Sequence, residues 1–194
     1  MHLENTSEAH PIQVFWGEMS ACEHFVQIYD DNDVFMSTLE DFIARGLLAG
    51  ESCVTIATAA HLGLLGQRLR ARGVDVETLA ADDRYIALDA EKILAQFIIQ
   101  GFPDDRLFNR VILEILGRAK GPGQRKVRAF GEMVALLWAQ GLHAAATQME
   151  HLWHDLCRSE QFPLFCAYPR AGFKQDAIKS IEQICATHSK VIGS

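Results

Sequence analysis

Short runs of β-branched and aromatic residues alternate along this chain with longer amphipathic stretches. Five such runs predict strands, over residues 24–29, 53–58, 84–88, 126–130 and 163–168. None of them alternates strictly between polar and apolar residues, which favours strands that are covered on both faces. Strands that alternate with helices indicate an α/β fold, with a mainly parallel sheet and helices on both of its faces.

The stretches between the strands carry apolar residues at spacings of three and four, the period of an amphipathic helix. They predict helices over residues 33–50, 60–73, 90–99, 105–121, 133–158 and 175–192. Gly50 should end the first of these helices, and Gly141 should divide the fifth into two. In such a fold, ligands bind at the carboxyl ends of the strands, so those ends are where candidate site residues are sought.

Composition and charge narrow the class of protein. The 194 residues fit one domain, predicted over 12–194 after a flexible segment 1–11. The net charge is −7 and there is no basic run, so nucleic acid is not expected as a partner. The polar start and the lack of a long apolar stretch predict a cytoplasmic protein that does not bind membranes. The five cysteines form no C-x-x-C pair, as expected of free thiols.

Acidic residues follow two of the predicted strands. The first predicted strand ends at Tyr29, and Asp30, Asp31 and Asp33 come directly after it, where a nucleotide-binding loop would instead carry glycines, a lysine and a serine or threonine. ATP with magnesium is therefore not expected as a cofactor. Asp33 is predicted to cap the next helix, and Asp89 to cap the helix after the third strand. Contact with a ligand is the alternative for each of these acids.

Charged and aromatic residues also mark the last two strands. Glu132 follows the fourth strand, where it is either part of a recognition pocket, a helix-starting acid, or a catalytic carboxylate. Arg128 lies inside that apolar strand and needs a partner, which would be Glu132, an acid after the first strand, or an anionic ligand. At the end of the fifth strand, Tyr168 offers an aromatic face and a hydroxyl, and the following Arg170 either meets an anion or is solvated.

Histidines and cysteines show no complete metal-binding pattern. His151 and His154 lie three residues apart on a predicted helix, and Cys185 and His188 form a C-x-x-H pair. Neither pair comes with a recognisable third ligand, so no metal site is predicted. No serine nucleophile elbow is present either, and no catalytic residue is assigned.

Several segments together resemble one known family. The stretches VFWGEMSACEHFVQIYDDND, FIARGLLAGESCVTIAT, VRAFGEMVALLWAQG, LFCAYP and ICATHSKVI look like the methanogen/methylotroph sensory domain, MEDS, from about Phe15 to Ile192. The resemblance implies a RecA-like fold without a P-loop, and a role in sensing small molecules in bacterial or archaeal signal transduction. By position, His24 and His188 match motif residues of the family, as do Tyr29, Arg128, Glu132 and Tyr168.

These observations favour a non-catalytic, stand-alone sensory module that binds a small organic ligand or a signalling protein. Its pocket is expected at the carboxyl ends of the strands, lined by Tyr29, Arg128, Glu132 and Tyr168. No kinase or DNA-binding module follows in the sequence, so the output is expected to run through a histidine kinase, a response regulator, or self-association.

Two alternatives remain open at this point. One is a divergent nucleotide-binding protein with weak or no ATPase activity, in which Glu132 activates water and Asp30, Asp31 and Asp33 hold a metal ion. The missing phosphate-binding loop argues against it. The other is a pure interaction scaffold.

Overall fold

A six-stranded sheet forms the centre of the molecule. The computed structural model describes residues 19–173, 184 and 188–192. All neighbouring strands of the sheet run parallel, in the order β3-β2-β6-β7-β1-β8. Their bounds are β1 His24–Tyr29, β2 Ser52–Ala57, β3 Tyr85–Asp89, β6 Val127–Gly131, β7 Leu164–Pro169 and β8 Lys190–Ile192. This architecture confirms the prediction of a parallel α/β fold.

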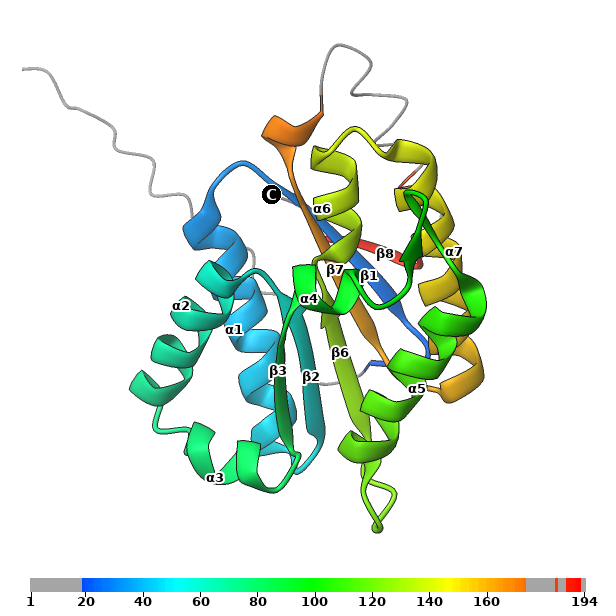
Figure 1. Cartoon of the computed structure of the whole chain (residues 1–194). Helices are drawn as coiled ribbons and strands as arrows, with labels where there is room; N and C mark the ends of the chain where they lie inside the picture. Colours follow the sequence, from blue (N-terminus) through cyan, green and yellow to red (C-terminus); the bar gives the residue numbers. More distant parts are fainter. Residues whose placement is uncertain (1–18, 174–183, 185–187, 193–194) are drawn as a thin grey trace, which may run out of the picture.

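Helices cover both faces of the sheet (Figure 1). Three of them lie on one face: α1 Asn32–Leu48, α2 Ala59–Ala71 and α3 Val76–Ala81. The other face carries α4 Ala90–Leu94, α5 Asp105–Lys120, α6 Met133–Ala139 and α7 His143–Glu160. A two-stranded antiparallel ribbon joins α4 to α5, with β4 Ile98–Ile99 and β5 Phe102–Pro103, and a 3-10 turn, η1 Arg170–Gly172, follows β7.

Each face of the sheet has its own apolar core. Phe35, Phe42 and Phe130 pack on the α1 side, where they are completely buried. On the α7 side, the ring of Trp153 meets Phe108 edge to face, with centroids 5.2 Å apart. The two cores explain why the strands lack polar alternation, because successive side chains point to opposite faces of the sheet and both faces are buried.

The structure corrects two predicted elements and adds a helix. The predicted helix 90–99 is only the short α4, and Ile98–Ile99 belong to the ribbon. Helix α3 was not predicted. Lys190–Ile192, at the end of the predicted helix 175–192, instead form the strand β8, which pairs with β1. Most of the rest of that predicted helix lies outside the described residues, and so does the predicted segment 1–11.

Glycines end or separate helices as predicted. Gly50, two residues beyond α1, has a φ of +83°, and Gly141, between α6 and α7, has a φ of +77°. Both angles lie in the left-handed region, which glycine adopts without steric cost. Within the described part of the chain, none of the helices combines the length and the apolarity needed to cross a membrane.

Candidate functional site

Glu132 organises the carboxyl edge of the sheet. Its side chain accepts a hydrogen bond from the backbone N–H of Thr58 (2.9 Å) and lies 2.8 Å from Nδ1 of His61. Nε2 of His61 in turn lies 3.0 Å from Oδ1 of Asn32. These four residues, here called the carboxyl-edge cluster, tie the ends of β6 and β2 to the starts of α2 and α1. Glu132 stands at the N-cap position of α6 without capping it, and its carboxylate serves the start of α2 instead.

This position is the one that ligands take in doubly wound folds. Helix α2 leaves β2 toward one face and α6 leaves β6 toward the other, so a crevice is expected between these neighbouring strands. Glu132 is buried, and its carboxylate already accepts a hydrogen bond from the N–H group of Thr58 at the start of α2. The backbone N–H group of Thr58, which could otherwise bind an anionic ligand, is therefore already hydrogen-bonded to a side chain of the protein.

Tyr29 and the aspartates after β1 also have structural partners. The ring of Tyr29 is buried and stacks on Phe35, with centroids 4.4 Å apart. Burial, with a smaller contribution from the charge of Glu132, raises the pKa of Tyr29 to about 12. Asp31, rather than the predicted Asp33, is the N-cap of α1, because its side chain accepts from the N–H groups of residues 33 and 34.

The remaining charged candidates of this edge form ion pairs or caps. Asp33 lies in the first turn of α1 and pairs with Arg68 at 2.8 Å. Asp30 pairs with Arg170 at the same distance. Asp89 is the N-cap of α4 and accepts from the N–H of residue 92, which confirms the predicted cap.

Arg128 lies at the opposite end of the sheet from Glu132. It is the second residue of β6, and its guanidinium is bonded to Glu51 (Nε to Oε2, 2.6 Å) and to the carbonyl of Phe42 (2.8 Å). The side chain is 3% exposed and crosses α1 at Gly46, where a Cβ atom would lie 2.6 Å from its Cδ. The partner of Arg128 is thus an acid between α1 and β2, which none of the predicted pairings included.

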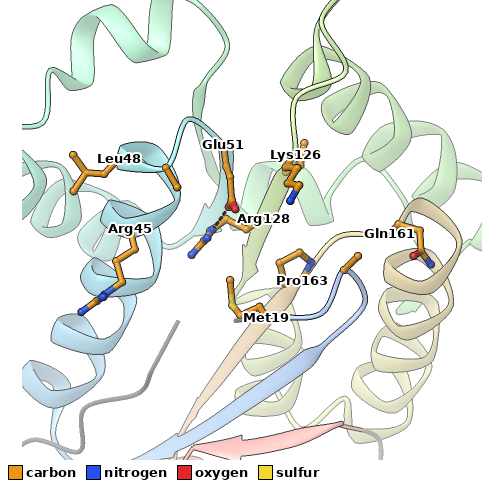
Figure 2. A pocket seen from close by; sticks show the side chains of 11 residues that line it. Met19, Arg45, Leu48, Glu51, Lys126, Arg128, Gln161 and Pro163 are labelled. Carbon is orange, nitrogen blue, oxygen red and sulfur yellow. Dashed lines mark hydrogen bonds and ion pairs between the residues drawn. The ribbon is translucent and has the colours of Figure 1, made fainter. Parts of the chain in front are cut away.

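A pocket opens beside this ion pair (Figure 2). Its volume is about 590 Å³, within the range of small-molecule sites. We call it the amino-edge pocket, because its walls come from the segments that enter β1, β6 and β7 and from the end of α1. The side chains around it are Met19, Ala21, Arg45, Leu48, Ala49, Glu51, Lys126, Val127, Arg128, Gln161 and Pro163.

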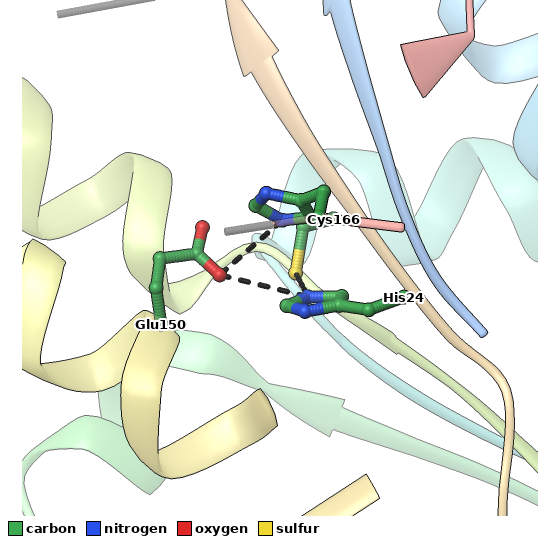
Figure 3. Close-up of side chains that lie close together, drawn as sticks. His24, Glu150 and Cys166 are labelled. Atoms are coloured by element: carbon green, nitrogen blue, oxygen red, sulfur yellow. Dashed lines mark hydrogen bonds and ion pairs between the residues drawn. The ribbon is translucent and has the colours of Figure 1, made fainter. Parts of the chain in front are cut away.

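A third group of polar side chains is buried between the sheet and α7. It consists of His24 on β1, Glu150 on α7, Cys166 on β7 and His188 just before β8, and is here called the buried cluster. Figure 3 labels the first three of these residues. Its ligand-type atoms all lie within 4.8 Å of one another. Tyr168, one of the predicted pocket residues, donates a hydrogen bond to Oε1 of Glu150 at the rim of this cluster.

Burial and mutual charge set the protonation of the buried cluster. Burial, helped by the neighbouring His188, lowers the pKa of His24 to about 3. Burial also acts against ionisation of Glu150 and His188, but their mutual attraction and hydrogen bonds outweigh it. The pKa of Glu150 is therefore lowered and that of His188 is raised. Burial first, and then the charge of Glu150, place the pKa of Tyr168 and of Cys166 well above their usual values.

The predicted four-residue pocket is therefore not assembled. Tyr29 and Glu132 lie near the carboxyl edge, Arg128 lies at the amino edge, and Tyr168 faces the other side of the sheet. Sequence reasoning also missed the meeting of His24 with Cys166 and Glu150. The available signal was weak: a histidine opening one apolar strand and a cysteine within another.

Comparison with known proteins identifies the family. No curated protein matches the chain. The model of one family, described as MEthanogen/methylotroph, DcmR Sensory domain, matches residues 23–189 and so includes the carboxyl-edge cluster, Arg128 and the whole buried cluster. The match covers most of the chain and confirms the resemblance seen in the sequence. The chain belongs to the MEDS family of sensory domains.

Proposed function

We propose that this protein is a non-catalytic sensory module that receives a small organic ligand in the amino-edge pocket and passes the signal to a partner protein. Membership of a sensory family supports the sensory role. The observation that carries the choice of site is the pocket of about 590 Å³ beside the Arg128–Glu51 pair. The carboxyl-edge cluster is a weaker candidate, because its carboxylate is engaged with the backbone of α2.

The walls of the pocket indicate the chemistry of the ligand. Arg45, Lys126 and Arg128 bring three positive charges to it, and Glu51 brings one negative charge. Leu48 is 78% exposed and, with Met19, offers apolar surface beside these charges. A small molecule with an apolar body and one anionic or strongly polar group suits this mixture, because a few polar groups orient a ligand that apolar contacts hold.

Ligand binding in this pocket has a direct route to the rest of the fold. The pocket joins the end of α1 to the start of β6, and the Arg128 side chain links the two elements through Phe42 and Glu51. A ligand that favours one placement of this side chain shifts the balance between two conformations of the domain. The partner that reads the shift is proposed to be a histidine kinase or a response regulator, or a second copy of the chain.

Filling the pocket tests the proposal. Ala49 lines the pocket at the C-cap of α1 and is exposed, so Ala49→Trp places an indole at its mouth without disturbing the core. Ala71, the exposed last residue of α2, provides the matched control Ala71→Trp. Both variants and the native chain are screened by thermal shift against small organic anions and alcohols, together with any small molecule that mass spectrometry finds in the purified protein.

The proposal expects at least one compound to raise the midpoint of the native chain and of Ala71→Trp, but not of Ala49→Trp. Lys126→Ala should weaken the binding of anionic compounds, whereas Arg106→Ala, a charge removed from the outside of α5, should not. Equal shifts in all variants would place the ligand elsewhere. Metal-dependent release of phosphate from ATP that disappears in Glu132→Gln would replace the proposal with the nucleotide-hydrolase alternative.

A further inference from the structure

We propose that His24, Glu150, Cys166 and His188 bind one transition-metal ion, with zinc the best fit to their chemistry. The four side chains come from β1, α7, β7 and the segment before β8, so the site exists only in the folded chain. It is separate from the amino-edge pocket, and it does not depend on the ligand proposed there.

The distances between the four side chains match those of a coordination sphere. Ligand atoms about 2.0–2.3 Å from one ion at tetrahedral angles lie roughly 3.3–3.8 Å from each other. Nε2 of His24 lies 3.3 Å from Sγ of Cys166 and 3.6 Å from Oε2 of Glu150. Nε2 of His188 lies 3.3 Å from the same carboxylate oxygen. All four ligand-type atoms of the cluster lie within 4.8 Å of one another, close enough to share one ion. Figure 3 shows how His24, Glu150 and Cys166 point toward one another.

Groups around the cluster hold the ligand atoms in the orientation that a metal requires. Nδ1 of His188 lies 2.7 Å from the carbonyl oxygen of Ile184, so this nitrogen carries the proton and Nε2 faces the cluster. The hydroxyl of Tyr168 donates to Oε1 of Glu150, which leaves Oε2 directed at the two histidines. Such a backbone carbonyl behind a histidine and a donor behind a carboxylate are usual around metal ligands.

Burying the carboxylate of Glu150 in this cluster costs free energy unless a positive charge lies beside it. Glu150 is 2% exposed and His24 is completely buried, and both sit in the apolar core of the α7 face. Oε2 of Glu150 is buried, and the polar atoms facing it are Nε2 of His188 at 3.3 Å and Nε2 of His24 at 3.6 Å. A buried carboxylate oxygen is normally paired or bound to a cation, and a divalent ion at the centre of the cluster meets that need.

The identity of the four ligands narrows the choice of metal. Two imidazoles, one thiolate and one carboxylate suit zinc and its first-row neighbours, whereas calcium and magnesium prefer oxygen ligands alone. Four protein ligands close a tetrahedral site, so the ion would hold the fold rather than activate water. It would join His188, two residues before β8, to the centre of the sheet, and so support β8, which pairs with β1 over three residues.

The metal content of the purified chain is the first test. The chain is prepared without chelators and with any affinity tag removed, and its zinc, iron, cobalt, nickel and copper are counted by mass spectrometry. We expect close to one equivalent of metal per chain. After the metal is stripped, Co²⁺ should restore one equivalent and give a thiolate-to-cobalt charge-transfer band, which reports ligation by Cys166.

Variants then assign the ligands. Cys166→Ala should abolish the charge-transfer band and weaken zinc binding, and Tyr168→Phe should weaken it about 10–100-fold by freeing the carboxylate of Glu150. Cys53→Ser removes another buried thiol, on the opposite face of the sheet, and should leave the band unchanged. Amide exchange at Val191 in β8 should speed up when the metal is removed.

Some outcomes would overturn the proposal. One is a native chain that carries less than about a tenth of an equivalent of metal and shows no cobalt band at any Co²⁺ concentration, because this result needs no variant to fold. Another is a cobalt band that survives in Cys166→Ala and disappears in Cys53→Ser, which would move the site to the other face.

Discussion

Gly46 is the position at which the placement of Arg128 can be tested most directly. It lies within α1, and the Arg128 side chain passes over its Cα on the way to Glu51. A Cβ atom there would meet Cδ at 2.6 Å and Cζ at 2.9 Å, and it would lie nearer still to Nε. Gly46→Ala therefore expels the guanidinium from its site, although alanine is otherwise the better helix former.

The expected cost follows from the contacts that are lost. The hydrogen bond from Arg128 to the carbonyl of Phe42 is worth about 1.5–3 kcal/mol, because the donor is charged and the site is buried. Glu51 is 20% exposed and regains water, so loss of its ion pair adds roughly 1 kcal/mol. The helical preference of alanine returns at most about 1 kcal/mol. The net effect is a destabilisation of about 1.5–3 kcal/mol, or roughly 3–12 °C in the melting midpoint.

Urea denaturation of matched variants measures this effect. Gly63 in α2 and Gly117 in α5 are helical and exposed, and a Cβ atom at either would meet nothing within 4 Å. Gly63→Ala and Gly117→Ala should therefore stabilise the chain by up to about 1 kcal/mol, opposite in sign to Gly46→Ala. In an Arg128→Ala background the clash is absent, and Gly46→Ala should become neutral or stabilising.

The double-mutant cycle separates this explanation from a general intolerance of α1. A Gly46→Ala variant as stable as Gly63→Ala would show that Arg128 does not lie across α1. An equal cost of Gly46→Ala with and without the Arg128 side chain would refute the clash as its cause.

Three further perturbations test other parts of the structure. Glu132→Ala removes the acceptor at Thr58 and the charge at the start of α2, and should cost about 1.5–3 kcal/mol in urea denaturation; a cost below about 0.5 kcal/mol would mean that the carboxyl-edge cluster is not structural. Burial raises the pKa of Tyr85 to about 12, so the folded state favours the neutral phenol. This contribution to the free energy of unfolding is complete below about pH 10 and is lost as the pH rises through about 12. From about pH 8 to about pH 11, the free energy of unfolding of the native chain should therefore fall by about 1.4 kcal/mol more than that of Tyr85→Phe. Equal losses in the two chains would contradict burial of Tyr85 as the cause. Gly141→Ala forces a side chain into a φ of +77° between α6 and α7 and should cost about 1–2 kcal/mol, whereas no measurable cost would show that this turn relaxes freely.

Runs of β-branched and aromatic residues were enough to predict the five longer strands of the sheet. The strand 24–29 is observed with the predicted bounds, and the other four predicted strands are shifted by a single residue. The errors fall on short elements. Strand β8 has three residues, and its pairing with β1 lies far from it in the sequence, so no local signal separates it from a helix end.

The candidate site was harder to predict than the fold. Arg128 was rightly expected to have a partner, but the strand direction places it near the amino edge, where Glu51 is in reach. The space for its side chain comes from Gly46 on α1, and the periodicity of that helix does not indicate which side chain of the sheet crosses there. Glu132 was placed correctly at a strand end, yet its partner belongs to a different strand and helix.

Period, capping residues and turn glycines are local properties, and the sequence by itself was enough to determine the class of fold, the parallel character of the sheet and the Asp89 cap. The order of the strands is not local, because it depends on how two apolar cores pack on either side of the sheet. Only that order brings His24 within 3.3 Å of Cys166, although 142 residues separate them along the chain. The tertiary structure therefore decided which polar side chains share a site, since side chains from distant strands meet only after the apolar faces are buried.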